Sequence, residues 1–116
     1  MGNLKEKGKR WEELVKQYYL ARGYTLVAQN YTIRGGELDL IMKRKKNLTI
    51  IEVKTLDTIK EFDEYITPNK LHALERTVQS FLQQVDESEF DEVSIDVVLV
   101  SHGEITEIYE NVTGGW

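Results

Sequence analysis

Two apolar segments with charged residues inside them most restrict how this chain can fold. Residues 37 to 44 and 48 to 54 are rich in Leu, Ile and Val, and acidic side chains interrupt both. The second segment is a nearly continuous apolar run, which is typical of a central strand buried on both faces. Side chains alternate between the faces of a strand, so Glu52 and Lys54 are predicted to share one face. If the two strands pair as a hairpin, Asp39 can lie beside them.

Charged side chains at the end of a buried strand are unfavourable unless another group compensates them. Two carboxylates and a lysine placed together can hold a divalent metal ion and an activated water molecule. We therefore interpret Asp39, Glu52 and Lys54 as a candidate catalytic site. The alternative is that Glu52 and Lys54 form an ordinary ion pair at the end of a strand.

The remaining pattern predicts an α/β domain with the element order α-β-β-β-α-β-β, a mixed sheet flanked by helices. Gly35 and Gly36 predict a turn between the first two strands, because paired glycines readily adopt positive φ. Thr67 is a predicted N-cap with Pro68 at the first helical position. The predicted helices span residues 4 to about 22 and 68 to about 85, and the predicted strands span residues 24–32, 37–44, 48–54, 93–101 and 105–109.

The first predicted helix carries two adjacent acids that should differ in their surroundings. At about 100° per residue, Glu13 points away from the apolar stripe that contains Trp11 and Val15. Glu12 lies at the edge of that stripe, so its side chain can lie along a buried surface. The alternative is that both acids are solvated.

Composition restricts the remaining possibilities. The chain has 116 residues, which suits a single domain covering residues 1–116, and it has no Cys and only two His. Thiolate sites are excluded, a histidine zinc site is not expected, and a reducing cytoplasm is the expected location. No apolar run is long enough to cross a membrane. The net charge of −5 divides into +6 for residues 1–60 and −11 for residues 61–116, so the basic half holds the candidate site.

The ordered set of motifs resembles the PD-(D/E)xK nuclease superfamily, which has the restriction-endonuclease-like fold, and more closely the YraN-like family of predicted endonucleases related to archaeal Holliday junction resolvases. The resemblance extends over nearly the whole chain, with departures such as Trp11 and Leu56, where the family usually has Gly and Arg. The matching positions are Glu12, Gly23-Tyr24, Asn30, Gly35-Gly36-Glu37-Leu38-Asp39-Leu40-Ile41, Ile51-Glu52-Val53-Lys54-Thr55, Lys70 and Asp96-Val97-Val98.

This resemblance implies a divalent-metal-dependent endonuclease. Asp39, Glu52 and the carbonyl of Val53 would bind Mg²⁺ or Mn²⁺, and Lys54 would assist the attacking water. Glu12 would be a supporting acid. The implied substrate is DNA, including branched recombination or repair intermediates.

Basic residues are the candidate contacts to the nucleic-acid backbone, and such contacts position a duplex without reading its sequence. The resolvase relatives act as dimers, which implies that this chain could form a homodimer. The competing hypothesis is a non-catalytic nucleic-acid-binding or protein-interaction module on the same fold, and the acidic second half favours a protein partner. The candidate backbone contacts are Lys9, Arg10, Arg34, residues 43–46 and Lys70.

Overall fold

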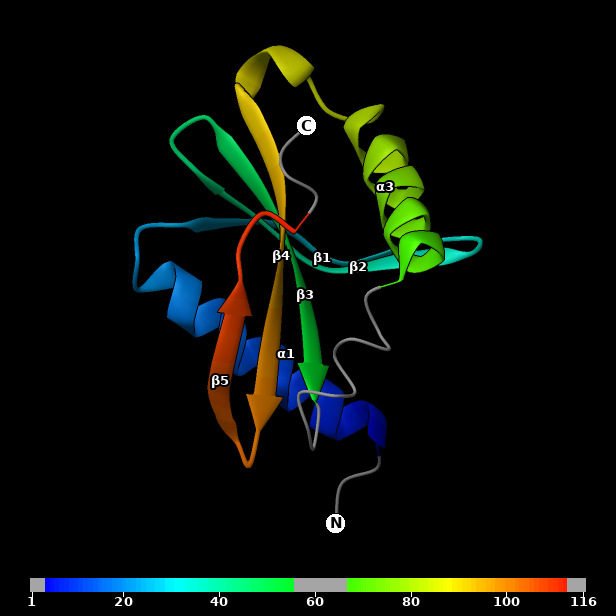
Figure 1. The fold of residues 1–116 in the computed structure, drawn as a ribbon. Helices are drawn as coiled ribbons and strands as arrows, with labels where there is room; N and C mark the ends of the chain where they lie inside the picture. The colour runs from blue at the N-terminus through cyan, green and yellow to red at the C-terminus, as the bar shows by residue number, and fades with distance from the viewer. Residues whose placement is uncertain (1–3, 56–66, 113–116) are drawn as a thin grey trace.

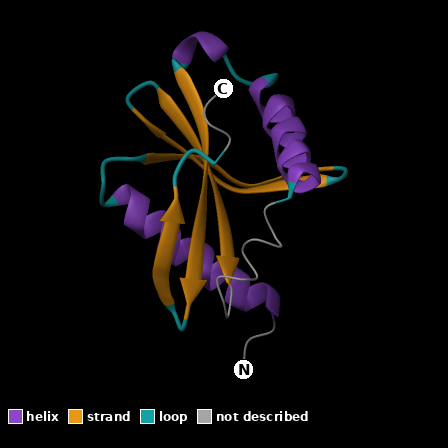
Figure 2. Cartoon of the chain, viewed as in Figure 1, coloured by secondary structure: helices purple, strands orange, loops and turns teal. Residues whose placement is uncertain are grey.

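The computed structural model of the protein describes residues 4–55 and 67–112, and side chains from Arg10 onward. Its element order confirms the predicted α/β arrangement (Figure 2). No helix in these ranges is long and apolar enough to span a membrane. The elements are α1 (Leu4–Leu20), β1 (Thr25–Ile33), β2 (Gly36–Arg44), β3 (Asn47–Thr55), α3 (Pro68–Leu82), a short 3₁₀ helix η1 (Glu87–Glu89), β4 (Glu92–Ser101) and β5 (Glu104–Tyr109).

The five strands form one mixed sheet in the order β1-β2-β3-β4-β5. β3 pairs antiparallel with β2 and parallel with β4, so it is the central strand that its apolar run predicts. The predicted hairpin is confirmed, with Leu40 opposite Ile51 and Ile41 opposite Ile50. α1 and α3 lie on opposite faces of this sheet (Figure 1).

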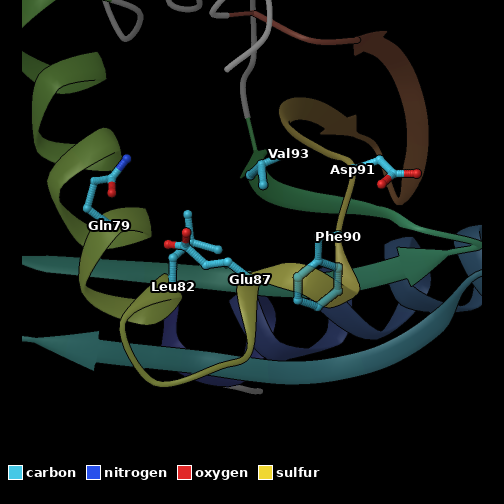
Figure 3. A pocket seen from close by; sticks show the side chains of 6 residues that line it. All are labelled: Gln79, Leu82, Glu87, Phe90, Asp91 and Val93. Atoms are coloured by element: carbon cyan, nitrogen blue, oxygen red, sulfur yellow. The ribbon is translucent and has the colours of Figure 1, made fainter.

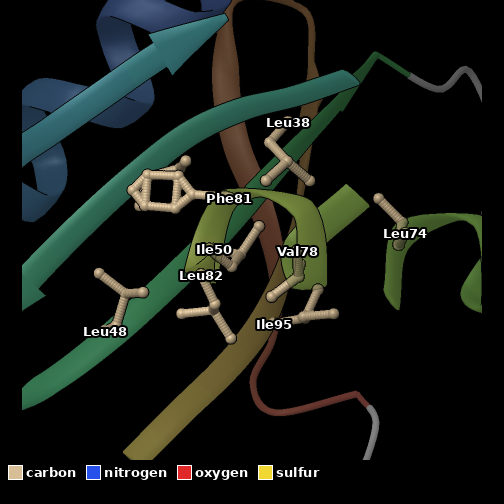
Figure 4. Packing of buried hydrophobic residues seen from close by; sticks show 9 residues of the cluster. Leu38, Leu48, Ile50, Leu74, Val78, Phe81, Leu82 and Ile95 are labelled. Carbon is tan, nitrogen blue, oxygen red and sulfur yellow. The ribbon is translucent and has the colours of Figure 1, made fainter. Parts of the chain in front are cut away.

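Alternation along β3 divides its side chains between two hydrophobic clusters. Ile50 packs in the cluster under α3, together with Val78 and Phe81 of that helix (Figure 4). Ile51 packs in the cluster under α1, together with Val15 and Tyr19. Each helix therefore buries one apolar stripe against one face of the sheet, which is the main source of stability for helices of this length.

The start of α3 is as predicted, whereas its end is three residues earlier. The Thr67 side chain caps the helix by accepting a hydrogen bond from the Lys70 N–H at 3.3 Å. After Leu82 the backbone tightens, because the Gln84 N–H bonds the carbonyl three residues back, that of Phe81. Val85 still packs against the core from this turn. Because Val85 is apolar and half-buried at helical spacing, the sequence pattern predicted a helix that extends to this residue.

The hairpin of β1 and β2 bends away from β3 at the level of Asp39. Leu38 packs under α3 and Leu40 under α1, although side chains two apart on a regular strand share a face. The pairing of β2 with β3 ends at Leu40, whereas the pairing of β1 with β2 continues on both sides of this point. Asn30 of β1, which the register places opposite Asp39, has a left-handed φ of 52°. Figure 1 shows the hairpin running beneath α3 while β3 continues in another direction.

Gly36 allows α3 to approach the bent hairpin closely. A Cβ atom at this position would collide with Oγ1 of Thr77, which lies on the buried face of α3. The Thr77 hydroxyl donates to the Ala73 carbonyl at 2.8 Å and is therefore held in place. Glycine here is a packing requirement.

We predict that Gly36→Ala lowers the unfolding free energy by about 1–3 kcal/mol, the usual range for overpacking, measured by urea denaturation. The loss should be smaller in a Thr77→Ala background, because the colliding hydroxyl is removed. Gly35→Asn is the control for backbone strain without a collision, since Gly35 has open space around it and a φ of 89°, where Asn is strained less than most residues, and its loss should be the same in both backgrounds. An equal loss in both backgrounds would contradict the packing explanation.

Candidate metal centre

The candidate site lies where β2 separates from β3. Continuing their register by one step beyond Leu40 and Ile51 places Asp39 opposite Glu52. The Val53 N–H donates to Oδ2 of Asp39 at 2.8 Å, and the Asp39 N–H donates to Oε1 of Glu52 at 3.4 Å. The carboxylates thus accept hydrogen bonds from backbone N–H groups that lie beyond the end of the β2–β3 ladder, and the structure brings the two predicted acids together.

The pair is desolvated. Glu52 is 5% exposed and Asp39 is half-buried. Burial raises the pKa of Asp39, and it raises the pKa of Glu52 well above its ordinary value, with the neighbouring Asp39 charge and a hydrogen bond between the two side chains as further causes. The charge of Glu37 raises both pKa values further. Without a cation, the two carboxyls are therefore expected to release their protons at higher pH than isolated carboxyls do.

Lys54 follows two residues after Glu52 on β3 and is half-buried. Its positive charge lowers the pKa of Asp39, although burial has the larger, opposite effect. Lys54 is therefore close enough to act electrostatically on the acidic pair. This is the geometry that the alternating strand pattern predicts.

The two acids of α1 differ as the helical wheel predicts. Glu13 is exposed and forms an ion pair with Lys16 at 2.7 Å. Glu12 is half-buried and accepts a hydrogen bond from Nδ2 of Asn30 at 2.6 Å. The same Nδ2 lies 3.5 Å from Oε1 of Glu37, which joins Glu12 to the edge of the site.

Two further residues belong to the site although the sequence analysis gave them no role. Glu37 affects both buried carboxyls electrostatically, and alternation from Asp39 was the signal that could have identified it. Asn30 connects Glu12 with Glu37 and has a left-handed φ, which the local sequence pattern of a strand does not predict. Within the described ranges no three Asp, Glu, His or Cys side chains converge as a complete ligand set.

A hollow of about 160 Å³ opens beside the acidic pair, between the bent hairpin and the first half of α3. Glu37, Glu52 and Lys70 contribute its charged lining. A larger hollow of about 340 Å³ lies at the other end of α3 (Figure 3), and the buried carboxylates do not line it. We take the smaller hollow as the candidate site because Glu52, the more deeply buried acid of the pair, lines it. The smaller hollow is lined by Gly36, Glu37, Glu52, Lys70, Ala73, Leu74 and Thr77. The larger hollow is lined by Gln79, Leu82, Glu87, Phe90, Asp91 and Val93.

The predicted basic contacts divide into near and distant groups. Lys70 lines the smaller hollow, and Arg34 is exposed in the turn two residues before Gly36. Residues 43–46 form the opposite end of the β2–β3 hairpin, about 17 Å from Asp39 at the rise of a strand. Arg10 is exposed on α1 with its guanidinium 6.0 Å from the Trp11 ring. The side chain of Lys9 lies outside the described part.

Asp96 has a structural position away from this pair. Tyr19 donates a hydrogen bond to its Oδ2 at 2.9 Å, and the Asn111 N–H donates to its Oδ1 at 3.0 Å. Asp96 is buried, which raises its pKa, and Tyr19 is buried as well. This bond links α1 to β4 two helical turns beyond Glu12.

The fold and the site define a class of α/β protein in which a central β-strand and its bent neighbour carry a buried carboxylate pair followed by a lysine. The chain belongs to the uncharacterised protein family UPF0102, whose model matches residues 11–100. It is 32% identical to a UPF0102 protein of Petrotoga mobilis, over 89% of this chain and 93% of the relative. A UPF0102 protein of Helicobacter pylori is 33% identical over 94% of this chain and 92% of the relative.

We predict that the metal-free protein loses stability as pH rises above the usual titration range of carboxyls. The pKa values of Asp39 and Glu52 are raised in the folded state. The folded state therefore binds more protons than the unfolded chain between the ordinary and the raised pKa values, and stability falls through that window. Glu52→Gln should reduce this slope in urea denaturation between pH 4 and 8, and the raised pKa of Asp96 should leave a residual fall.

Glu13→Gln is the control for this measurement. Glu13 has a lowered pKa, chiefly because of its hydrogen bond with Lys16. A lowered pKa has the opposite sign, since it adds stability as pH rises. Replacing Glu13 therefore cannot remove the fall in stability, and a flattened slope in this variant would contradict our assignment to the buried pair.

Proposed function

We propose that this protein is a divalent-metal-dependent nuclease that hydrolyses DNA phosphodiester bonds. The observation that carries the proposal is the buried pair of Asp39 and Glu52 beside Lys54, placed at a strand separation that opens into a hollow. The order of motifs along the chain, which resembles the PD-(D/E)xK nucleases, supports the same interpretation. Branched recombination or repair intermediates are the substrates that this resemblance favours.

The donor set suits Mg²⁺ or Mn²⁺. Two desolvated carboxylates with raised pKa values would be compensated by a bound cation. The N–H and C=O groups of one strand residue point to the same side, so the Val53 carbonyl faces the edge at which its N–H meets Asp39. Asp39, Glu52 and the Val53 carbonyl would therefore hold the ion through oxygen atoms, which hard cations prefer.

A bound Mg²⁺ would lower the pKa of a water molecule and offset charge on the phosphate. Lys54 is suited to donate hydrogen bonds to the attacking oxygen or to phosphate oxygens, because it lies two residues beyond Glu52 on the same face of β3. Glu12 would support the site from α1 through Asn30. Burial keeps bulk water away from Glu52, which strengthens electrostatic interactions there.

The surroundings favour an extended polyanion as substrate. Lys70 lines the hollow and Arg34 is exposed at the neighbouring turn, so both could contact the backbone phosphates that flank the cleaved bond. These contacts carry no sequence information. A homodimer, which the resolvase relatives suggest, would place two such sites on one branched DNA.

We predict that Asp39→Asn and Glu52→Gln abolish Mn²⁺ binding and cleavage together, whereas Lys54→Ala retains the metal. Removing Lys54 takes away a neighbouring cation, so Mn²⁺ affinity should be unchanged or slightly higher. Its cleavage rate should fall on the order of 100-fold or more, the usual effect of losing a charge-stabilising donor. Calorimetry measures binding, and cleavage is screened on linear, single-stranded, flapped and four-way DNA with Mg²⁺ or Mn²⁺.

Glu13→Ala is the matched control, since this exposed acid on α1 should affect neither binding nor cleavage. If Glu52→Gln and Lys54→Ala changed stability equally and neither altered Mn²⁺ affinity, the two residues would form a structural ion pair. Metal-independent DNA binding without turnover would instead support the binding-module alternative.

We predict that Lys70→Ala weakens DNA binding and lowers the slope of log affinity against log salt concentration by about 1. The physical reason is the loss of one phosphate contact beside the hollow. Arg22→Ala is the control, because Arg22 is an exposed cation that stacks on Tyr18 beyond the end of α1 and is not among the candidate contacts. Fluorescence anisotropy with a labelled duplex at several salt concentrations measures the slope, and an equal reduction in both variants would contradict a localised contact.

A further inference from the structure

Asn30 occupies a special position in β1. The register on either side of it pairs Gln29 with Leu40 and Tyr31 with Leu38, so Asn30 faces Asp39 across the hairpin. Its φ of 52° lies in the left-handed region, which Asn adopts more readily than most residues other than Gly. Asn30 therefore lies at the level where the hairpin bends away from β3.

The side chain of Asn30 joins two acids from different elements. Nδ2 lies 2.6 Å from Oε1 of Glu12 on α1 and 3.5 Å from Oε1 of Glu37 on β2. The amide carries two N–H donors, so one nitrogen can serve both carboxylates. The shorter contact has the length of a strong hydrogen bond to a charged acceptor, whereas the longer one is weak.

The two carboxylates would repel each other without this amide, because like charges at short range are unfavourable. Glu37 also acts electrostatically on Asp39 and Glu52. The amide therefore lies between the acid of α1 and the acidic group at the strand separation. Glycine could supply the same backbone conformation, but only Asn or a similar residue also supplies the donor.

We propose that Asn30 is a positioning residue that holds the Glu12 carboxylate beside Glu37, at the edge of the proposed metal centre, where its negative charge favours a bound cation. This inference rests on the proposed metal-dependent function. Asn30 provides the bend of the hairpin with its backbone and the orientation of Glu12 with its side chain. Its effect on the metal passes through Glu12.

A double-mutant cycle on Mn²⁺ affinity tests this route. Asn30→Gly keeps the left-handed backbone accessible and removes the amide. We expect it to weaken Mn²⁺ binding about fivefold, within the range of direct couplings between contacting residues. In a Glu12→Gln background the same change should have no further effect on affinity, because the carboxylate that the amide positions is already absent.

Two more variants extend the cycle. Asn30→Asp retains the size and the backbone preference but places a like charge beside Glu12, so the melting temperature at neutral pH should fall below that of Asn30→Gly. In the double variant, the amide introduced by Glu12→Gln can donate to the carboxylate introduced by Asn30→Asp, so Glu12→Gln should relieve part of that loss. Gln29→Ala is the matched control, since Gln29 accepts a bond from Lys16 of α1 at 3.4 Å without touching an acid.

The outcomes separate the two proposals. Unchanged affinity in Asn30→Gly, or an equal loss with and without the Glu12 carboxylate, would overturn the positioning role while leaving a metal centre at Asp39 and Glu52. Absence of Mn²⁺ binding by the unmodified protein would overturn the metal centre and the positioning role together. Melting temperatures of the same variants show whether a loss of affinity accompanies a loss of folding.

Discussion

The separation of β2 from β3 beyond Leu40 is the constraint on which the site depends. Backbone N–H groups at a buried strand end need acceptors, and a sheet normally supplies them from the next strand. Here the Asp39 carboxylate accepts the hydrogen bond of the Val53 N–H, and the Glu52 carboxylate accepts a longer hydrogen bond from the Asp39 N–H. The bend therefore creates both the hollow and the need for carboxylates at its edge.

This arrangement costs stability, because desolvation disfavours charged carboxylates. The raised pKa values of Asp39 and Glu52 express that cost. A proton compensates the pair at low pH, and the divalent cation that we propose would do so at higher pH. Buried acids of this kind concentrate at functional sites, where local rules of folding are broken for chemical reasons.

The two helices hold the site from opposite faces of the sheet. α3 approaches the bent hairpin closely only because Gly36 has no side chain to meet Thr77. α1 packs against the other face through Val15 and Tyr19, and the Tyr19 hydroxyl also bonds Asp96 of β4. Glu12 of the same helix is held by Asn30 of β1.

Periodicity in the sequence determined the element order, the central place of β3 and the different surroundings of Glu12 and Glu13, because burial on a helix or strand follows its local repeat. The predicted hairpin also brought Asp39 and Glu52 together. The bend at Asn30 and Asp39, the role of Glu37 and the true end of α3 depended on contacts between elements distant in the chain. Only the tertiary structure decided these, since a left-handed φ and the electrostatic neighbours of a carboxylate are set by packing across the sheet.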